Sequence, residues 1–204
     1  MRALLLVDLQ YDFMSGGALA VPDGDATLIV AQQLLPRFDL VVATQDNHPV
    51  DHGSFITQHP GAAVGDQVML AGLPQTVWPV HCVIGSPGAE IHASLDPKAI
   101  TRIFPKGTDR NIDSYSGFFD NGKRKATGLG DYLAAQGVST VYVMGLALDY
   151  CVKFTALDAL GLGFATQLIL EGCRAVNLQP GDGAAAVDEM RAAGVTITSS
   201  SAIS

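Results

Sequence analysis

Short apolar runs that alternate with helical stretches constrain the fold of this chain more than any other feature of its sequence. The runs are partly β-branched and do not alternate cleanly with polar residues, as in strands that are covered on both faces. They comprise residues 3–7, 40–43, 100–104, 140–144, 165–170 and 195–198. The helical stretches comprise residues 25–35, 130–136, 152–160 and 184–193. This order predicts an α/β fold, a three-layer doubly wound sheet of about six mainly parallel strands with helices on both faces. Two long loops, residues 45–88 and 107–127, break the rhythm and are expected to be functional.

The length and charge of the chain limit its organisation and its partners. With 204 residues, we expect a single domain over residues 1–204. No apolar run approaches the roughly 18 residues of a membrane helix. The net charge of −8 offers no basic stripe to nucleic acid or to an anionic membrane surface, so neither is expected as a partner. Three cysteines, an odd number, argue against a disulfide framework and favour the cytoplasm. The sequence leaves the formation of a homo-oligomer open.

The segment from Gly145 to Cys151 marks a candidate nucleophile. A valine-rich run ends at Gly145, and Cys151 then opens a helical pattern. A tight turn after a strand presents backbone N–H groups, and the positive end of the helix dipole favours a thiolate over a thiol. We therefore expect Cys151 to be a nucleophile whose thiol has a lowered pKa. The alternative is that Cys151 is a small buried packing residue, as free cysteines usually are.

Asp8 and Lys106 occupy two further strand ends. Asp8 follows the first apolar run, and Lys106 follows the third. The carboxyl ends of parallel strands form one rim, so these side chains are expected to meet Cys151 there. Asp8 would take the thiol proton, while Lys106 would keep Asp8 ionised and lower the pKa of the thiol. Taken singly, Asp8 would be read as a turn cap and Lys106 as a solvated surface charge.

Asp46 and His48 form a candidate metal site. They are two residues apart just past a strand, so an extended backbone turns both side chains to the same face. His81 in the following long loop supplies a third ligand. Two histidines and one carboxylate with open positions suit one divalent ion, for which we expect zinc, with iron or manganese as alternatives. Without such partners each histidine would only make hydrogen bonds. The remaining cysteines, Cys82 and Cys173, are expected to be packing residues.

Aromatic residues lie in or beside the loops that carry these groups. Phe13, Trp78 and Tyr115 would provide flat apolar walls for a small ligand, although buried aromatics usually belong to the core. Tyr115, Phe118 and Phe119 compete for one wall position, and the sequence does not choose among them.

Six segments of the chain recur together in one enzyme family. They are VDLQYDF (residues 7–13), TQDNH (44–48), WPVHCVIGSPGAE (78–90), FPKGTD (104–109), DSYSGFFD (113–120) and GLALDYCV (145–152). In this order they resemble the nicotinamidases of the isochorismatase-like cysteine hydrolases. The resemblance covers nearly the whole chain and is more specific than any single motif. It implies a six-stranded, three-layer α/β fold.

The resemblance also implies roles for individual residues. The family's catalytic and metal-binding sets match Asp8, Lys106 and Cys151, and Asp46, His48 and His81, respectively, with waters completing the metal shell. Its oxyanion donors match the N–H groups of Ala147 and Cys151, with a cis peptide bond between Leu146 and Ala147. Its matching aromatics enclose a pyridine ring whose nitrogen approaches the metal.

This chain departs from the family's pattern at two positions. Some nicotinamidases carry an additional metal ligand where this chain has Ser54, and His52 nearby is expected to lie behind the ligands or on the surface. Asn47 stands where an aromatic residue is often found between the first two ligands. The shape of that side of the site is therefore open, but the three ligands are not affected.

The implied reaction is the hydrolysis of nicotinamide to nicotinic acid and ammonia through a thioester on Cys151, a step of salvage toward NAD. The partner would be a small-molecule carboxamide. A related cysteine amidohydrolase acting on another carboxamide or on an N-carbamoyl compound is one alternative, and a non-catalytic binding module is another. A Rossmann-type cofactor enzyme is set aside, because no glycine-rich phosphate loop follows the first strand.

Overall fold

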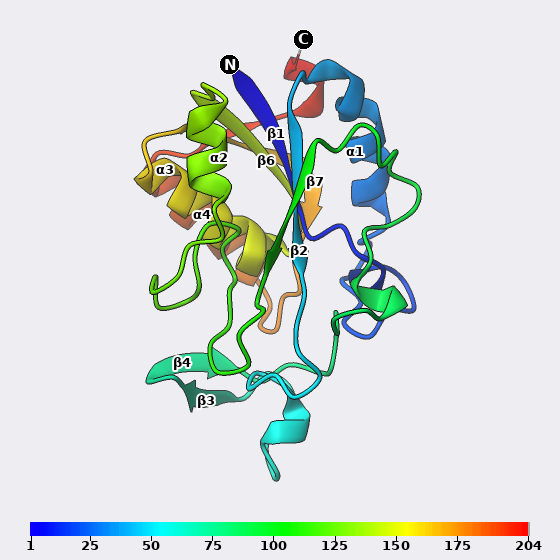
Figure 1. Ribbon diagram of the computed structural model, residues 1–204, viewed down its shortest axis with the longest axis vertical. Coiled ribbons are helices and arrows are strands. Elements are labelled where there is room, and N and C mark those ends of the chain that lie inside the picture. Colours follow the sequence, from blue (N-terminus) through cyan, green and yellow to red (C-terminus); the bar gives the residue numbers. More distant parts are fainter. Residues whose placement is uncertain (204) are drawn as a thin grey trace.

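The computed structural model describes residues 1–203 and has a six-stranded sheet at its centre (Figure 1). The strands of this sheet are β1 (Arg2–Val7), β2 (Val41–Asp46), β5 (Arg102–Lys106), β6 (Thr140–Leu146), β7 (Ala165–Arg174) and β8 (Thr196–Thr198). The α-helices are α1 (Ala26–Leu34), α2 (Leu129–Ala135), α3 (Lys153–Gly161) and α4 (Asp182–Ala193). Short 3₁₀ turns occupy Tyr11–Phe13, Leu35–Arg37, Ile56–Gln58, Pro87–Ala89 and Ser200–Ala202. Each predicted strand and helix is present, with ends that differ by a few residues.

The strand order is β5-β2-β1-β6-β7-β8, and every neighbouring pair is parallel. The chain builds outward from β1 through β2 to β5, and it then returns to the other side of β1 for β6. This reversal makes β1 the switch point of a doubly wound sheet, where ligands bind beyond the carboxyl ends of the strands. The predicted fold class is confirmed, whereas the strand order could not be predicted from local patterns.

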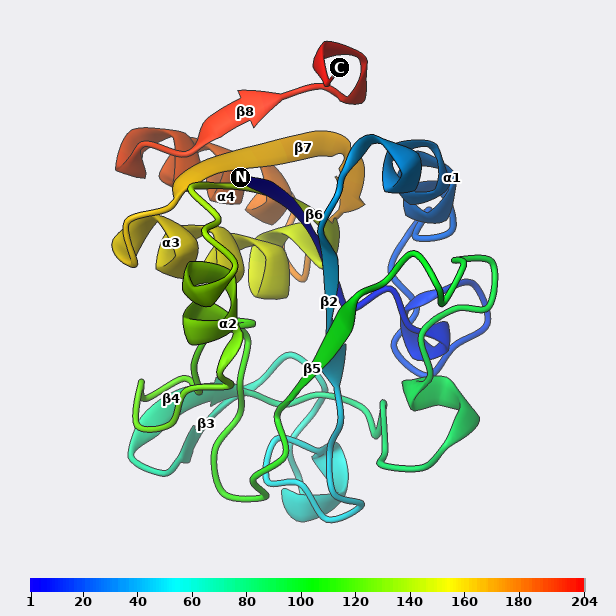
Figure 2. The same ribbon diagram turned by 45° about the horizontal axis from the view of Figure 1, so that its top comes forward.

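Helices cover both faces of the sheet (Figures 1 and 2). Helix α1 packs against β6 and β7 on one face, and α2, α3 and α4 lie on the other. The central strand β1 is covered on both sides, so Leu4, Leu5 and Leu6 are all fully buried. This double coverage explains why the strand is apolar throughout instead of alternating with polar residues. No helix within residues 1–203 is long and apolar enough to cross a membrane.

The long loop of residues 45–88 contains a hairpin that the sequence analysis did not predict. Strands β3 (Gln67–Leu70) and β4 (Leu73–Thr76) pair antiparallel. Ala71 and Gly72 join them, both with positive φ, as a tight two-residue hairpin turn requires. Pro74 within β4 obscures the strand pattern, because proline cannot donate to a ladder. Figure 1 shows the hairpin beyond the carboxyl edge of the main sheet.

A glycine turns the chain from β6 toward the next helix. Gly145 has a φ of +130°, and a Cβ there would lie 2.1 Å from the carbonyl oxygen of Val7 on β1, so only glycine fits. The Leu146–Ala147 peptide bond is cis, as the resemblance implied. A π-helical turn, Leu148–Val152, follows and leads directly into α3. Cys151 lies inside this turn, at the carboxyl edge of the sheet.

Candidate active site

The ends of four strands bring the predicted site residues to one place. Asp8 follows β1, β2 ends at Asp46, β5 ends at Lys106, and Cys151 lies in the turn after β6. These strands are neighbours in the sheet, and Asp46 and Lys106 are register partners on β2 and β5. The convergence follows from the parallel arrangement, because all carboxyl ends share one edge.

The ammonium group of Lys106 is the centre of this site. It donates hydrogen bonds to Asp46 Oδ1 at 2.6 Å, to the Ser114 carbonyl oxygen at 2.9 Å and to Cys151 Sγ at 3.3 Å. Its Nζ also lies 2.9 Å from Asp8 Oδ2. The two groups form an ion pair, but the angles between them are poor for a hydrogen bond. Burial disfavours the charge of Lys106, yet the two carboxylates outweigh that effect and raise the pKa of the ammonium group well above its usual value. Lys106 therefore remains a cation at ordinary pH.

The two carboxylates beside Lys106 have opposite pKa shifts. Burial raises the pKa of Asp8 to about 6, although the charge of Lys106 and the Thr44 hydroxyl, which donates to Asp8 Oδ1 at 2.6 Å, both oppose the rise. Burial would also raise the pKa of Asp46. There, however, Lys106 and His48 outweigh burial, and the pKa falls well below its usual range. Asp46 is therefore always ionised, and Asp8 is a base that titrates.

Cys151 lines a cavity, and the residue is only 8% exposed. The Asp8 and Asp46 carboxylates and the Cys151 sulfur each have an atom within 4.8 Å of the others. Burial raises the pKa of the thiol well above its usual value, Lys106 opposes the rise, and the two negative carboxylates add to it. Lys106 lowers the pKa of the thiol as expected, but burial outweighs it, so the net lowering that we expected is wrong. A protonated thiol needs a neighbouring base before it can act as a nucleophile.

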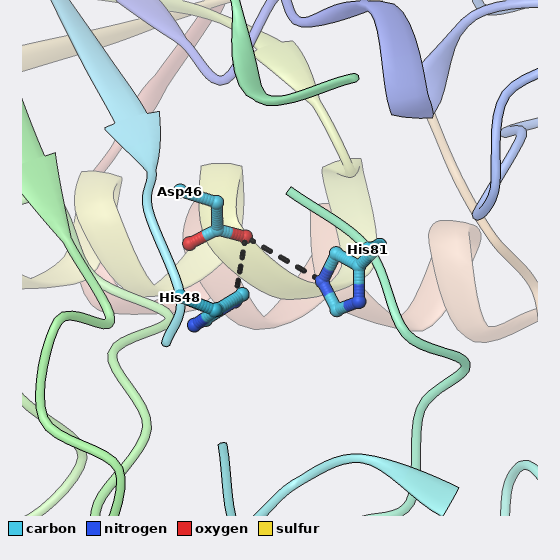
Figure 3. A group of neighbouring side chains, drawn as sticks. All are labelled: Asp46, His48 and His81. Atoms are coloured by element: carbon cyan, nitrogen blue, oxygen red, sulfur yellow. Dashed lines mark ion pairs between the residues drawn. The ribbon is translucent and has the colours of Figure 1, made fainter. Parts of the chain in front are cut away.

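Asp46, His48 and His81 form a cluster of potential metal ligands (Figure 3). Oδ2 of Asp46 lies 3.6 Å from His48 Nε2 and 3.9 Å from His81 Nε2. Nδ1 of His48 lies 2.8 Å from the Gly107 carbonyl oxygen, and Nδ1 of His81 lies 2.8 Å from that of Pro79. Since each Nδ1 can donate its proton to a carbonyl, the lone pair of each Nε2 is available beside Oδ2. This donor set fits one divalent ion.

The backbone around His48 leaves little freedom for its ring. Gly107 has a φ of +64°, and a Cβ there would lie 2.3 Å from His48 Cε1. On another side, the His52 ring lies 4.3 Å from the His48 ring between centroids, and His52 Nδ1 lies 2.7 Å from Ser54 Oγ. His52 is fully buried, so it lies beside a ligand and not on the surface, the other location considered for it.

The cavity in front of Cys151 has aromatic walls. Phe13, Trp78 and Tyr115 all line it, together with the three potential metal ligands. The Tyr115 hydroxyl accepts hydrogen bonds from Trp78 Nε1 at 3.2 Å and from Gln75 Nε2 on β4 at 3.0 Å. Of the three aromatics that competed for one wall, Tyr115 is the one at the cavity. Phe118 is buried instead, in a stacked pair with Phe164.

Some residues at the cavity were not identified from the sequence. They are Leu19, Asp113, Tyr150 and Val176. Asp113 and Tyr150 fall inside the recognised segments DSYSGFFD and GLALDYCV, so their place in those segments was a usable signal. Leu19 and Val176 are ordinary apolar residues in loops, and only the tertiary structure brings them to the cavity.

The other two cysteines are packing residues, as predicted. Cys82 is fully buried, and its backbone N–H donates to Asp12 Oδ2 at 2.6 Å. The sulfur of Cys173 on β7 lies 3.3 Å from the Ile169 carbonyl oxygen. Burial raises the pKa of both thiols, and neither lines the cavity.

Comparison with known proteins places this geometry in a family. The isochorismatase domain model matches residues 2–202. The nicotinamidase of Escherichia coli (strain K12) is 54% identical over 200 residues, which cover 96% of this chain and 93% of the relative. A solved nicotinamidase/pyrazinamidase from Acinetobacter baumanii is 40% identical, with a TM-score of 0.96, and the match covers 100% of this chain and 98% of that one.

A third match bears on the metal. The pyrazinamidase of Pyrococcus horikoshii, solved in complex with zinc, is 36% identical with a TM-score of 0.80, over 97% of this chain and 98% of that one. A divalent metal at the Asp46, His48 and His81 cluster agrees with this likeness. From the match over nearly its whole length and the identity to its relatives, the chain belongs to the isochorismatase family and, within it, to the nicotinamidases.

Proposed function

We propose that this protein is an amidohydrolase that converts nicotinamide and water to nicotinic acid and ammonia. The observation that carries the proposal is the contact of Lys106 with Cys151, Asp8 and Asp46 beside an aromatic cavity. A nucleophile, a base and a fixed cation are the groups that amide hydrolysis through a covalent intermediate requires. The 54% identity to the Escherichia coli nicotinamidase supports the choice of amide.

In the first half of the reaction, Asp8 removes the proton of the Cys151 thiol and the sulfur attacks the amide carbon. Because the pKa of the free thiol is raised, little thiolate exists before the base acts. Lys106, 3.3 Å from the sulfur, stabilises the negative charge as it forms. Asp8 then returns the proton to the amide nitrogen, the C–N bond breaks, and ammonia leaves a thioester on Cys151.

In the second half, Asp8 takes a proton from a water molecule, which attacks the thioester carbon. The C–S bond breaks, the thiol of Cys151 is regenerated and nicotinic acid is released. In both halves the carbonyl oxygen becomes negative, and we assign the backbone N–H groups of Ala147 and Cys151 as its donors. Removing one such donor costs about 3 kcal/mol of transition-state stabilisation in comparable enzymes.

Substrate binding is assigned to the aromatic walls and to the metal cluster. Phe13, Trp78 and Tyr115 would hold the flat ring of the substrate. Asp46, His48 and His81 would hold one divalent ion, for which we propose zinc. When bound, this ion supplies a Lewis acid for the pyridine nitrogen. The contacts of the Nδ1 atoms of His48 and His81 with backbone carbonyl oxygens keep both rings oriented for it.

We further propose that residues 1–204 act as one domain in the cytoplasm. All three cysteines are free, and a reducing compartment would keep the nucleophile Cys151 in that state.

The direct test is incubation of metal-replete protein with nicotinamide, with nicotinic acid and ammonia quantified separately. We expect equal amounts of both products from the wild type and none above background from Cys151→Ala. Cys82→Ala and Cys173→Ala are matched controls, because both remove a buried thiol that does not line the cavity. Folded wild-type protein that releases no nicotinic acid would refute the substrate, and full activity of Cys151→Ala would refute the nucleophile.

A further inference from the structure

A buried hydroxyl contacts the proposed base from the neighbouring strand. Thr44 on β2 donates through Oγ1 to Asp8 Oδ1 at 2.6 Å, and both residues are fully buried. Among residues 1–203, it is the one side-chain hydrogen bond to Asp8 that has good geometry. A short bond from a hydroxyl to a carboxylate belongs to the strong, charge-assisted class. Both partners are shielded from bulk solvent by their burial.

The second oxygen of Asp8 is in a different position. Oδ2 is buried and has no hydrogen-bond donor among residues 1–203. Lys106 Nζ lies 2.9 Å away, but its three donors are directed to Asp46 Oδ1, the Ser114 carbonyl oxygen and Cys151 Sγ. Oδ2 therefore has an electrostatic neighbour but an open lone pair. A buried polar atom without a partner calls for an explanation.

The surroundings of Thr44 keep its hydroxyl on Asp8. Threonine is β-branched and has few χ1 conformations. A Cβ on Gly117 would lie 2.6 Å from Thr44 Cγ2, so the methyl group packs closely against the Gly117 backbone. Thr44 is also a register partner of Phe104, within the pairing of β2 with β5. With its methyl group held, the hydroxyl has little room to turn away from Oδ1.

We propose that Thr44 is a positioning residue that makes Oδ2 of Asp8 the oxygen that accepts the Cys151 proton. This rests on the proposed function, in which Asp8 is the base. With Thr44 donating to Oδ1, a proton can enter at Oδ2 without disturbing the existing hydrogen bond. A proton entering at Oδ1 would share that oxygen with the Thr44 hydroxyl and weaken its hydrogen bond, because a protonated oxygen is a poorer acceptor. The same hydroxyl stabilises the ionised form of Asp8, against the larger opposing effect of burial.

Other charged groups also face Asp8, and a test must hold them constant. They are Lys106 from β5, Asp46 from β2 and the Cys151 thiol from the π-helical turn. Thr44→Val leaves all three in place and exchanges the hydroxyl for a methyl group of similar size. Thr44→Ser keeps the hydroxyl and removes only the methyl group. The pair therefore separates hydrogen bonding from packing.

The experiment measures kcat and KM for nicotinamide against pH in metal-replete wild type, Thr44→Val and Thr44→Ser. For Thr44→Val we expect kcat at pH 7 to fall about tenfold or more, with KM within about twofold. The acidic limb of kcat/KM, where Asp8 takes up its proton, should move about one to two pH units upward. Thr44→Ser should keep the limb of the wild type.

A matched control is Thr166→Val. Thr166 on β7 is also buried, with its hydroxyl donating to the Phe164 carbonyl oxygen at 3.0 Å. It pairs with Val141 near the start of β6, at the opposite edge of the sheet from Asp8. We expect Thr166→Val to leave the acidic limb unchanged. If Thr44→Val kept the wild-type limb and kcat, or if Thr44→Ser shifted the limb equally, the proposal would be wrong.

A second measurement keeps the test independent of turnover and of one variant. The ¹³C carboxyl resonance of Asp8, assigned by its loss in Asp8→Asn, reports the pKa of Asp8 in the resting protein. Thr44→Ala, which is smaller than valine, replaces Thr44→Val if the latter does not fold. Either variant should raise this pKa relative to Thr44→Ser, and an unchanged value would refute the proposal. A wild type that does not hydrolyse nicotinamide would overturn the proposed function while this resonance still tested the role of Thr44.

Discussion

Asp8 and Asp46 are both buried carboxylates beside Lys106, yet their pKa values move in opposite directions. Lys106 Nζ lies 2.6 Å from Asp46 Oδ1 and directs a hydrogen bond to it, whereas it lies 2.9 Å from Asp8 Oδ2 in an ion pair with poorer hydrogen-bond geometry. Asp46 has two histidine rings close to its other oxygen. Asp8 has none, and burial raises its pKa to about 6.

The comparison shows how one lysine can serve two different carboxylates. A carboxylate that binds a metal must stay ionised, and the proposed ligand Asp46 does so because Lys106 and His48 outweigh the effect of burial. A general base works best when its pKa lies near the working pH, and Asp8 is closer to that value than an ordinary aspartate. Environments that push paired titratable groups apart often separate their chemical roles.

Removing Lys106 should have the largest effect, because both carboxylates lose the cation that they share. In Lys106→Met, two carboxylates and no cation would remain in the interior. Breaking a buried ion pair costs about 3–5 kcal/mol, so we expect the free energy of unfolding at pH 7 to fall by about that amount. Turnover should fall below about a thousandth of the wild type, since base and thiolate both lose support. Urea unfolding and nicotinamide hydrolysis check the two effects.

The control for this variant is Lys123→Met. The Lys123 ammonium pairs with Asp158 at 2.6 Å, but it is 67% exposed, and exposed pairs contribute roughly 0–1 kcal/mol. We expect neither stability nor turnover to change much. If Lys106→Met and Lys123→Met lost equal stability and equal turnover, the buried ammonium group shared by the two carboxylates would have no special role in either.

Replacing each carboxylate by its amide should separate their roles. Asp8→Asn removes the base, and we expect kcat to fall by about 10²–10⁴ while bound metal stays near the wild-type level. Asp46→Asn removes a proposed ligand, and metal affinity should fall by more than about 100-fold, beyond the usual cost of losing a supporting contact. Metal analysis after dialysis, alongside steady-state kinetics, distinguishes them. If Asp8→Asn lost its metal as readily as Asp46→Asn, the division between base and ligand would not hold.

A substitution at Gly107 tests the His48 ring, which lies beside Asp46, without changing either carboxylate. In Gly107→Ala the new Cβ would lie 2.3 Å from His48 Cε1, so the ring must leave its present position beside Asp46. We expect metal affinity to fall about 10–100-fold, measured by competition with a chelator. Gly163→Ala is the control, because Gly163 also has a positive φ, of +91°, but no atom of residues 1–203 lies within 4 Å of its would-be Cβ. Weaker metal binding in both variants would point to backbone strain instead of ring displacement.

The pH dependence of wild-type activity compares the two carboxylates without any substitution, and its expected effect is the smallest. Asp8 accepts a proton only when ionised, and its pKa is raised from 3.8 to about 6. Activity should therefore be present above pH 6 and lost as the pH falls through that value, with kcat/KM falling about tenfold per unit below it. Asp46 stays ionised in this range. Metal content measured at each pH separates loss of the base from loss of the ion. An acidic limb near pH 4 would mean that Asp8 behaves as an ordinary aspartate.

The sequence was sufficient for the elements and for most of the polar groups of the site. Apolar runs of strand length, separated by helical stretches, reflect burial on both faces of the sheet. This pattern can be recognised from short stretches of the sequence. The positions of Asp8, Asp46, Lys106 and Cys151 could also be predicted, because the carboxyl ends of parallel strands share one edge. The hairpin β3–β4 was missed, since Pro74 and half-exposed side chains give a weak strand pattern.

Tertiary structure alone decided how these groups affect one another. The sequence suggested a thiolate at Cys151, but the balance between burial and the charges of Lys106, Asp8 and Asp46 depends on distances across four strands, and it favours the thiol. The same holds for Thr44, whose contact with Asp8 arises only because β1 and β2 are neighbours. The sequence by itself determined which chemical groups reach the edge of the sheet, because side-chain type and strand direction are local. Their order in the sheet and their depth of burial are properties of the whole fold, and these set the opposite pKa shifts of Asp8 and Asp46.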